Sequence, residues 1–169
     1  MSSSQNPIGV NAVLANANPT RTAISLFSLI GRVAIITGAH RGIGLEAALA
    51  YAEAGAVVYC LDLPEQPDQD WLKVQKFVQQ LPSLSIGEGS QTAQGKGRLE
   101  YAHCDVTNQK AMWDLVEKIA DKEGRLDVCF ANAGILQGAE VLDYPAEDFK
   151  KVRKERCFGE VCMFLILQL

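Results

Sequence analysis

The sequence predicts an α/β fold in which a parallel sheet carries helices on both faces, as in the first half of a doubly wound fold. Short apolar runs alternate with amphipathic segments along the chain. The runs are apolar throughout rather than at every second residue, which is typical of parallel strands buried on both faces. We therefore expect about four to five strands joined by right-handed crossovers, without an internal repeat or a second domain.

Four apolar runs are the predicted strands, and predicted helices separate them. The strands are residues 33–36, 57–61, 99–104 and 126–130, and the helices are residues 43–55, 70–81, 107–124 and a segment from about residue 146. Gly55, Pro82 and Gly124 are expected to end the first three helices. Thr107 is the expected N-cap of the third helix. Residues 83–97 are polar and glycine-rich, which predicts an exposed loop.

Length, composition and charge limit the classes of protein to which the chain can belong. Its 169 residues suit one domain, and 48% of them are apolar, which is enough for a core. The net charge of −4 excludes a broadly basic nucleic-acid-binding protein. No apolar stretch approaches the roughly 18 residues of a membrane span, so no membrane partner is expected. Five cysteines without a CxxC pair indicate neither a disulfide framework nor a metal site, and they favour a reducing, cytoplasmic compartment.

The two ends of the chain differ in composition from its middle. Residues 1–25 are rich in Ser, Asn and Ala and low in charge, which predicts a flexible leader. Arg21 and the absence of any acid before Glu46 leave a mitochondrial presequence as the alternative. Residues 153–169 pass into an apolar run from Val161, which we interpret as a divergent, truncated end. The alternative is a native C-terminal helix that docks on a partner.

The strongest functional signal is the glycine-rich segment between the first strand and the first helix, Thr37-Gly38-Ala39-His40-Arg41-Gly42-Ile43-Gly44. Glycines allow a sharp turn and let a pyrophosphate approach the backbone, while the N-terminus of the next helix stabilises the anion. Asp62 ends the second strand, where a carboxylate can accept hydrogen bonds from both hydroxyls of an adenosine ribose. Methyltransferases that bind S-adenosylmethionine use a similar turn and acid, so they are an alternative at this point.

The spacing Thr-Gly-x3-Gly-x-Gly resembles that of the short-chain dehydrogenase/reductase family. Residues 104–107 (Cys-Asp-Val-Thr) and 131–134 (Ala-Asn-Ala-Gly) are similar to two further family motifs, with Ala131 in place of an Asn. The resemblance covers residues 26–152 and disfavours the methyltransferase. It implies a Rossmann-type dinucleotide-binding domain and hydride transfer between a nicotinamide cofactor and a secondary alcohol or ketone. The cofactor-binding residues that it implies are Gly38, Arg41, Gly42, Ile43, Gly44, Asp62, Asp105, Val106, Asn132, Ala133 and Gly134, with Asp105 meeting the adenine.

Two residues bear on the choice between NAD and NADP. Asp62 would repel a 2′-phosphate, which favours NAD. Arg41 stands just before the second glycine, and in this family such a residue often accompanies NADP. No Lys or Arg follows Asp62, where the sequence continues Leu-Pro-Glu. NAD is therefore favoured, and NADP is the alternative.

The catalytic residues that the resemblance implies are absent from the sequence. The family uses a Tyr with a Lys four residues later, a Ser that holds the substrate oxygen, and an Asn on the fifth helix. No tyrosine here has Lys at that spacing, no Ser follows Ser90, and Arg156 falls at the Asn position. The sequence thus predicts no catalytic residue, and two functions stay open: an incomplete oxidoreductase, or an inactive dinucleotide-binding or interaction module. The family forms homo-oligomers, an assembly that truncation would disfavour.

Four aromatic or histidine residues complete the candidates. Trp71 and Trp113 fall on apolar helical stripes and are expected in the core. His103 lies on a predicted strand and is also expected to be packed inside. His40 lies in the glycine-rich segment, where it either touches a cofactor or is exposed to solvent.

Overall fold

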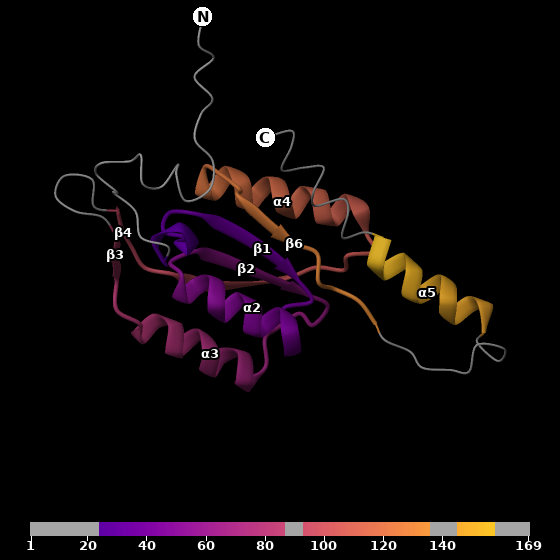
Figure 1. Cartoon of the computed structure of the whole chain (residues 1–169). Helices are drawn as coiled ribbons and strands as arrows, with labels where there is room; N and C mark the ends of the chain where they lie inside the picture. Colours follow the sequence, from indigo (N-terminus) through magenta and orange to yellow (C-terminus); the bar gives the residue numbers. More distant parts are fainter. Residues whose placement is uncertain (1–23, 87–92, 136–144, 158–169) are drawn as a thin grey trace, which may run out of the picture.

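A four-stranded parallel sheet lies at the centre of the molecule (Figure 1). The computed structural model describes residues 24–86, 93–135 and 145–157. The strands are β1 (Val33–Thr37), β2 (Val57–Asp62), β5 (Arg98–His103) and β6 (Val128–Phe130), in the spatial order β5-β2-β1-β6. All neighbouring pairs in this sheet are parallel, which confirms the predicted fold class.

The order of the strands reverses beside β1. The chain moves outward from β1 to β2 and β5, and then returns to the opposite side of β1 with β6. In an open α/β sheet, ligands bind outside the carboxyl ends of the strands at such a reversal. The carboxyl ends of β1 and β6 are therefore the expected place for a ligand.

Helices cover both faces of the sheet. The helices are α2 (Gly42–Glu53), α3 (Gln69–Gln80), α4 (Gln109–Glu123) and α5 (Ala146–Cys157), preceded by a short 3-10 helix, η1 (Ile24–Phe27). Helices α2 and α3 lie on one side of the sheet and α4 on the other, whereas α5 stands clear of it (Figure 1). None of the helices in the described part of the chain is long and apolar enough to cross a bilayer.

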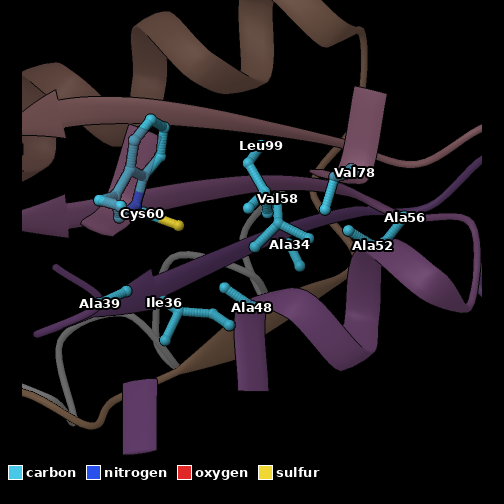
Figure 2. Packing of buried hydrophobic residues seen from close by; sticks show 11 residues of the cluster. Ala34, Ile36, Ala39, Ala48, Ala52, Ala56, Val58, Cys60, Val78 and Leu99 are labelled. Carbon is cyan, nitrogen blue, oxygen red and sulfur yellow. The ribbon is translucent and has the colours of Figure 1, made fainter. Parts of the chain in front are cut away.

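Alternate residues of the strands belong to two separate apolar cores. Ala34 and Ile36 of β1 pack against α2 and α3 in one core, which includes Trp71 of α3. Figure 2 shows this core. Val33 and Ile35 of the same strand pack in the core that contains α4. Because both faces of β1 are buried, its first four residues, Val33–Ile36, are all apolar. This explains the uninterrupted apolar runs in the sequence.

The observed helix ends agree with the sequence except at one N-cap. Gly55 and Gly124 follow α2 and α4 with φ of +99° and +72°, the left-handed conformation that favours glycine. The N-cap of α4 is Asn108 and not Thr107, so that prediction was wrong. The Asn108 side chain accepts a hydrogen bond from the Ala111 N–H, whereas the Thr107 N–H is bound by the Asp105 carboxylate.

The predicted loop over residues 83–97 contains two strands instead. Strands β3 (Leu84–Ile86) and β4 (Ala93–Gly95) pair antiparallel in a second, two-stranded sheet. A Cβ atom on Gly95 would lie 2.7 Å from Cγ2 of Ile30, so β4 lies close to the segment that precedes β1. The strands are only three residues long, which is too short for their alternation to stand out among polar neighbours.

Two side chains that we expected in the core are exposed. Trp113 is 45% exposed because Met112, Val116 and Ile119 form the buried stripe of α4. His103 is the last residue of the edge strand β5 and is also exposed. Trp71 is buried at 1% exposure, as expected.

Other sequence predictions fall on the ends of the chain. The predicted amphipathic segment from residue 146 is α5, but Phe149 on it is 58% exposed. Arg156 lies within α5. Residues 1–23 of the predicted leader and 158–169 of the divergent segment lie outside the described residues.

Candidate functional site

The glycine-rich turn follows β1 directly and leads into α2. Gly38 and Gly42 have φ of +66° and +58°, which a side chain would disfavour. A Cβ atom on Gly38 would lie 2.8 Å from Cα of Ala133, and one on Gly44 would lie 2.3 Å from the Gly38 carbonyl oxygen. Glycines therefore let this turn pack tightly against the segment that follows β6.

Asn132 holds the ends of β1 and β6 together. Its side-chain Nδ2 donates to the carbonyl oxygens of Thr37 and Gly38, at 3.1 and 3.0 Å. In return, Oγ1 of the buried Thr37 accepts the N–H groups of Asn132 and Ala133, at 3.2 and 3.0 Å. Four hydrogen bonds thus fix the carboxyl ends of β1 and β6 to each other, at the point where the order of the strands reverses. Gly134 follows and is exposed.

The N-terminus of α2 presents backbone N–H groups at the carboxyl end of the sheet. Its N-cap is Arg41, whose side chain makes no capping hydrogen bond. Gly42 and Ile43 are exposed, Ile43 at 74%, and a Cβ atom on Gly42 would meet no atom within 4 Å. The first N–H groups of a helix have no acceptor within the helix, so this turn suits an anion.

Asp62 ends β2 beside this turn. One carboxylate oxygen, Oδ2, accepts the His40 N–H at 2.9 Å, and Oδ1 accepts the Leu63 N–H at 2.8 Å. Each oxygen can still accept a second hydrogen bond. The carboxylate is therefore oriented by two backbone donors and is half-buried at the edge where a ribose would follow a bound diphosphate.

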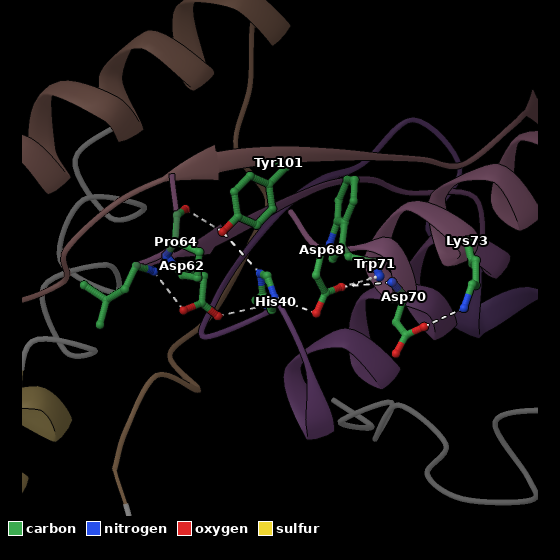
Figure 3. Close-up of polar contacts among 9 residues, drawn as sticks. His40, Asp62, Pro64, Asp68, Asp70, Trp71, Lys73 and Tyr101 are labelled. Atoms are coloured by element: carbon green, nitrogen blue, oxygen red, sulfur yellow. Dashed lines mark hydrogen bonds and ion pairs between the residues drawn. The ribbon is translucent and has the colours of Figure 1, made fainter. Parts of the chain in front are cut away.

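The His40 side chain joins a polar and aromatic cluster that the sequence did not reveal (Figure 3). His40 Nε2 lies 2.9 Å from Oδ2 of Asp68, and its Nδ1 lies 3.4 Å from the Tyr101 hydroxyl. The Tyr101 ring meets those of His40 and Trp71 edge-on, with centroids 6.0 and 5.3 Å apart. The His40 ring is thus not simply exposed to solvent, because both of its nitrogens lie near polar groups of the protein.

Electrostatic surroundings shift the pKa values of two members of this cluster. Burial, with the nearby Asp62 carboxylate, raises the pKa of Tyr101 to about 12. The backbone N–H of Trp71, which donates to the Asp68 carboxylate, lowers the pKa of that group, and His40 adds to the effect. Tyr101 is therefore a neutral hydrogen-bond donor at physiological pH, and Asp68 carries a negative charge.

Asp105 and Val106 follow β5 on the same edge of the sheet as Asp62. The Cys104 N–H donates to the Asp62 carbonyl oxygen at 2.8 Å, which places the two strand ends together. Asp105 Oδ1 accepts the Thr107 N–H at 2.8 Å, and Val106 is buried at 9% exposure. The fold thus brings the three predicted motifs to one edge.

Among the described residues, one tyrosine has a lysine ammonium against its ring. This tyrosine lies away from the strand ends that carry the site. Lys122 Nζ lies 5.4 Å from the ring centroid of Tyr59. Tyr59 is 5% exposed in the middle of β2, and its hydroxyl donates to Oε1 of Glu123 at 2.6 Å. This pair stabilises the packing of α4 on the sheet and is remote from the strand ends that carry the site. Within residues 24–86, 93–135 and 145–157 there is also no group of three His, Cys, Asp or Glu that could hold a metal ion.

Comparison with known proteins agrees with this arrangement. A family model described as short chain dehydrogenase matches residues 32–165. The chain is 33% identical over 125 residues to short-chain dehydrogenase reductase 3c of Arabidopsis thaliana, covering 73% of this chain and 41% of that protein.

Solved structures show the same fold. A short-chain type dehydrogenase/reductase from Mycobacterium marinum superposes with a TM-score of 0.66 and 30% identity, covering 88% of this chain and 52% of that one. The NADPH-dependent 3-quinuclidinone reductase from Rhodotorula rubra gives 0.61 and 26%, covering 86% and 51%. The chain therefore spans about half the length of the relatives that it matches. The family model covers well over half of the sequence, and the chain belongs to the short-chain dehydrogenase/reductase family.

Proposed function

We propose that this chain binds a nicotinamide dinucleotide at the carboxyl edge of β1, β2 and β6. The family uses NAD or NADP as its cofactor. The observation that carries the proposal is the position of the Asp62 carboxylate, which accepts the His40 N–H of the turn that leads into α2. An acid and a helix N-terminus so joined match the two parts of an adenosine diphosphate, the ribose diol and the diphosphate.

The residues of the site divide among the parts of the dinucleotide. The diphosphate would lie on the N–H groups of Gly42, Ile43 and Gly44, because α2 begins there. Asp62 would bind the adenosine ribose, and Asp105 with Val106 would meet the adenine. Segment 132–134, held to β1 by Asn132, would lie beside the nicotinamide half.

Charge favours NAD over NADP. The segment that begins at Asp62 also contains Glu65, Asp68 and Asp70, and it has no Lys or Arg before Lys73. Lys73 is paired with Asp70 at 2.8 Å. A 2′-phosphate beside Asp62 would meet the carboxylates of Asp62 and Asp68, which both bind His40, whereas the charge of Asp70 is paired with Lys73. Arg41, in the glycine-rich turn, is an exposed cation that would act in the opposite direction. We therefore propose NAD as the cofactor, with NADP as the alternative.

The reaction that we propose is hydride transfer between the nicotinamide and a secondary alcohol or ketone. The cofactor supplies the hydride chemistry, and this chain binds and orients it. Residues equivalent to the family's Ser, Tyr and Lys are not among these 169 residues, so we propose that full turnover requires a further, catalytic part. Their absence favours, as a second candidate, a dinucleotide-binding or interaction module without turnover.

We further propose that the protein resides in the cytoplasm, with the mitochondrion as the alternative. Cys60 is a free thiol buried in β2. A buried thiol of this kind fits a reducing compartment.

Calorimetric titration of the full chain with NAD⁺ and NADP⁺ tests the proposal. We expect NAD⁺ to bind more tightly, and Asp62→Asn to raise its Kd at least tenfold, because hydrogen bonds to a charged group contribute about 1.5–3 kcal/mol. Asp114→Asn is the matched control, because Asp114 is a half-exposed carboxylate on α4. A wild-type chain that binds neither dinucleotide would refute the proposal. A secondary alcohol that reduces NAD⁺ on the enzyme would reject the second candidate.

A further inference from the structure

His40 connects the glycine-rich turn to the loop that follows β2, through both its backbone and its ring (Figure 3). Its N–H donates to Oδ2 of Asp62 at 2.9 Å. Its Nε2 lies 2.9 Å from Oδ2 of Asp68, and because an ionised carboxylate only accepts, Nε2 carries the proton that is donated. One residue thus binds the acids at both ends of the segment 62–68.

Asp68 is itself firmly placed by the helix that it begins. Its Oδ1 accepts the N–H groups of Asp70 and Trp71, at 3.0 and 2.9 Å, as the N-cap of α3. Trp71 is almost wholly buried in the core beneath α3. The His40–Asp68 hydrogen bond therefore links the turn to an element that is anchored in the core.

Tyr101 supports the same loop at a second point. Its hydroxyl donates to the carbonyl oxygen of Pro64 at 2.8 Å, and its ring lies between those of His40 and Trp71. The His40 side chain is only 12% exposed, whereas the neighbouring Arg41 is exposed. The loop that follows Asp62 is thus fixed at Pro64 by Tyr101 and at Asp68 by His40.

We propose that His40 is a positioning residue for dinucleotide binding: bonded to Asp68, it holds the Asp62 carboxylate toward the ribose and keeps a second carboxylate beside it, which selects NAD over NADP. This inference rests on the proposed function. Two backbone N–H groups orient the Asp62 carboxylate: that of His40 in the glycine-rich turn and that of Leu63 in the loop after β2. Movement of residues 63–68 away from the turn would displace the Leu63 N–H, which donates the second of these bonds.

The charge of Asp68 provides the selectivity. Asp68 is ionised at neutral pH, as an aspartate with its ordinary pKa already is, and the backbone N–H of Trp71, and then His40, lower that pKa further. A 2′-phosphate on the ribose would be repelled by both Asp62 and Asp68, whereas the free hydroxyl of NAD would not. Removal of the Asp68 charge should therefore favour NADP.

Two variants with the same charge change separate this role from a general electrostatic effect. Asp68→Asn removes the charge that His40 binds and keeps a side-chain oxygen for the N-cap. Asp70→Asn removes a charge in the same turn, where Asp70 pairs only with Lys73 among the described side chains. By calorimetry with NAD⁺ and NADP⁺, we expect Asp68→Asn to reduce the preference for NAD⁺ about tenfold and Asp70→Asn to leave it unchanged.

The role of His40 is tested through its coupling to Asp62. We expect His40→Ala to weaken NAD⁺ binding about tenfold, and His40→Gln, whose amide can donate to Asp68, to restore most of the loss. In an Asp62→Asn background, His40→Ala should have little further effect, because its influence passes through Asp62. A residue that only stabilised the fold would weaken NAD⁺ and NADP⁺ equally and would act independently of Asp62.

The possible outcomes are distinct. If the wild-type chain binds NAD⁺ and both His40→Ala and Asp68→Asn leave affinity and preference unchanged, the positioning role is wrong and the proposed function stands. Equal losses for both dinucleotides, without coupling to Asp62, also overturn the role. If the wild-type chain binds neither dinucleotide, the proposed function and the role fail together. Should His40→Ala not fold, the pair Asp68→Asn and Asp70→Asn decides.

Discussion

Replacement of Gly44 by alanine tests how tightly the glycine-rich turn is packed. A Cβ atom there would lie 2.3 Å from the Gly38 carbonyl oxygen, 2.6 Å from Asn132 Nδ2 and 2.9 Å from Cα of Ala39. Real Cβ contacts are essentially never shorter than 3.0 Å, so the turn must shift by at least about 0.7 Å. Such overpacking costs about 1–3 kcal/mol, of which alanine recovers about 0.5–1 kcal/mol through its higher helix propensity.

We therefore expect Gly44→Ala to lower the free energy of unfolding by about 1 kcal/mol, the middle of the range of about 0–2.5 kcal/mol that these two terms leave. We also expect it to raise the Kd for NAD⁺ at least tenfold, because the displaced atoms form the turn itself. Urea denaturation and calorimetry measure the two effects. Gly31→Ala is the control: Gly31 has φ of +72° with no atom near its Cβ position, so only stability should fall. Wild-type stability and affinity in Gly44→Ala would refute the packing argument.

Three further predictions concern the fold. Asp127 accepts hydrogen bonds from Arg125, Arg32 and a backbone N–H; its burial alone would raise its pKa, but these donors hold the pKa at about 2. Because that pKa is below the ordinary value, the ionised Asp127 carboxylate stabilises the fold fully above about pH 4, and this contribution is lost as the pH falls through about 2. Asp127→Asn should cost about 1 kcal/mol at pH 7, since both arginines are half-exposed and screened, and should flatten the acid limb of a stability–pH curve; an unchanged limb would contradict this. Burial raises the pKa of Cys60 to about 12, so mass spectrometry should find Cys60 unalkylated by iodoacetamide at pH 8 unless the chain is denatured, and rapid native labelling would contradict its placement. Trp71→Ala should lower the unfolding free energy by about 3–5 kcal/mol in chemical denaturation, and a loss below 1 kcal/mol would show that Trp71 is not buried.

The sheet could be predicted from the sequence because its central strands are buried on both faces. An unbroken apolar run such as residues 57–61 has few other interpretations when a helix follows it. The pair β3 and β4 could not be predicted, because each strand has only three residues and its packing depends on Ile30, which is distant in the sequence. The expectation that Trp113 lies in the core was wrong, because an apolar stripe on a helix does not show which of its two borders faces the sheet.

The positions of the glycine-rich turn after β1 and of Asp62 at the end of β2 could be predicted, because each depends only on where a strand ends. The contacts of His40 could not, since its partners Asp68 and Tyr101 are 28 and 61 residues away along the chain. A weaker signal was present: Asp68 stands just before a helix, as an N-cap does. Thr37, which accepts two N–H groups after β6, likewise depends on the pairing of β1 with β6.

A crystal structure of the full chain grown with NAD⁺ tests the central claim most directly. The account predicts phosphate oxygens within hydrogen-bond distance of the backbone amides at the start of α2, and both adenosine ribose hydroxyls on the carboxylate of Asp62. Density for the dinucleotide at any other part of the surface, or an Asp62 carboxylate that makes no contact with it, would contradict the account.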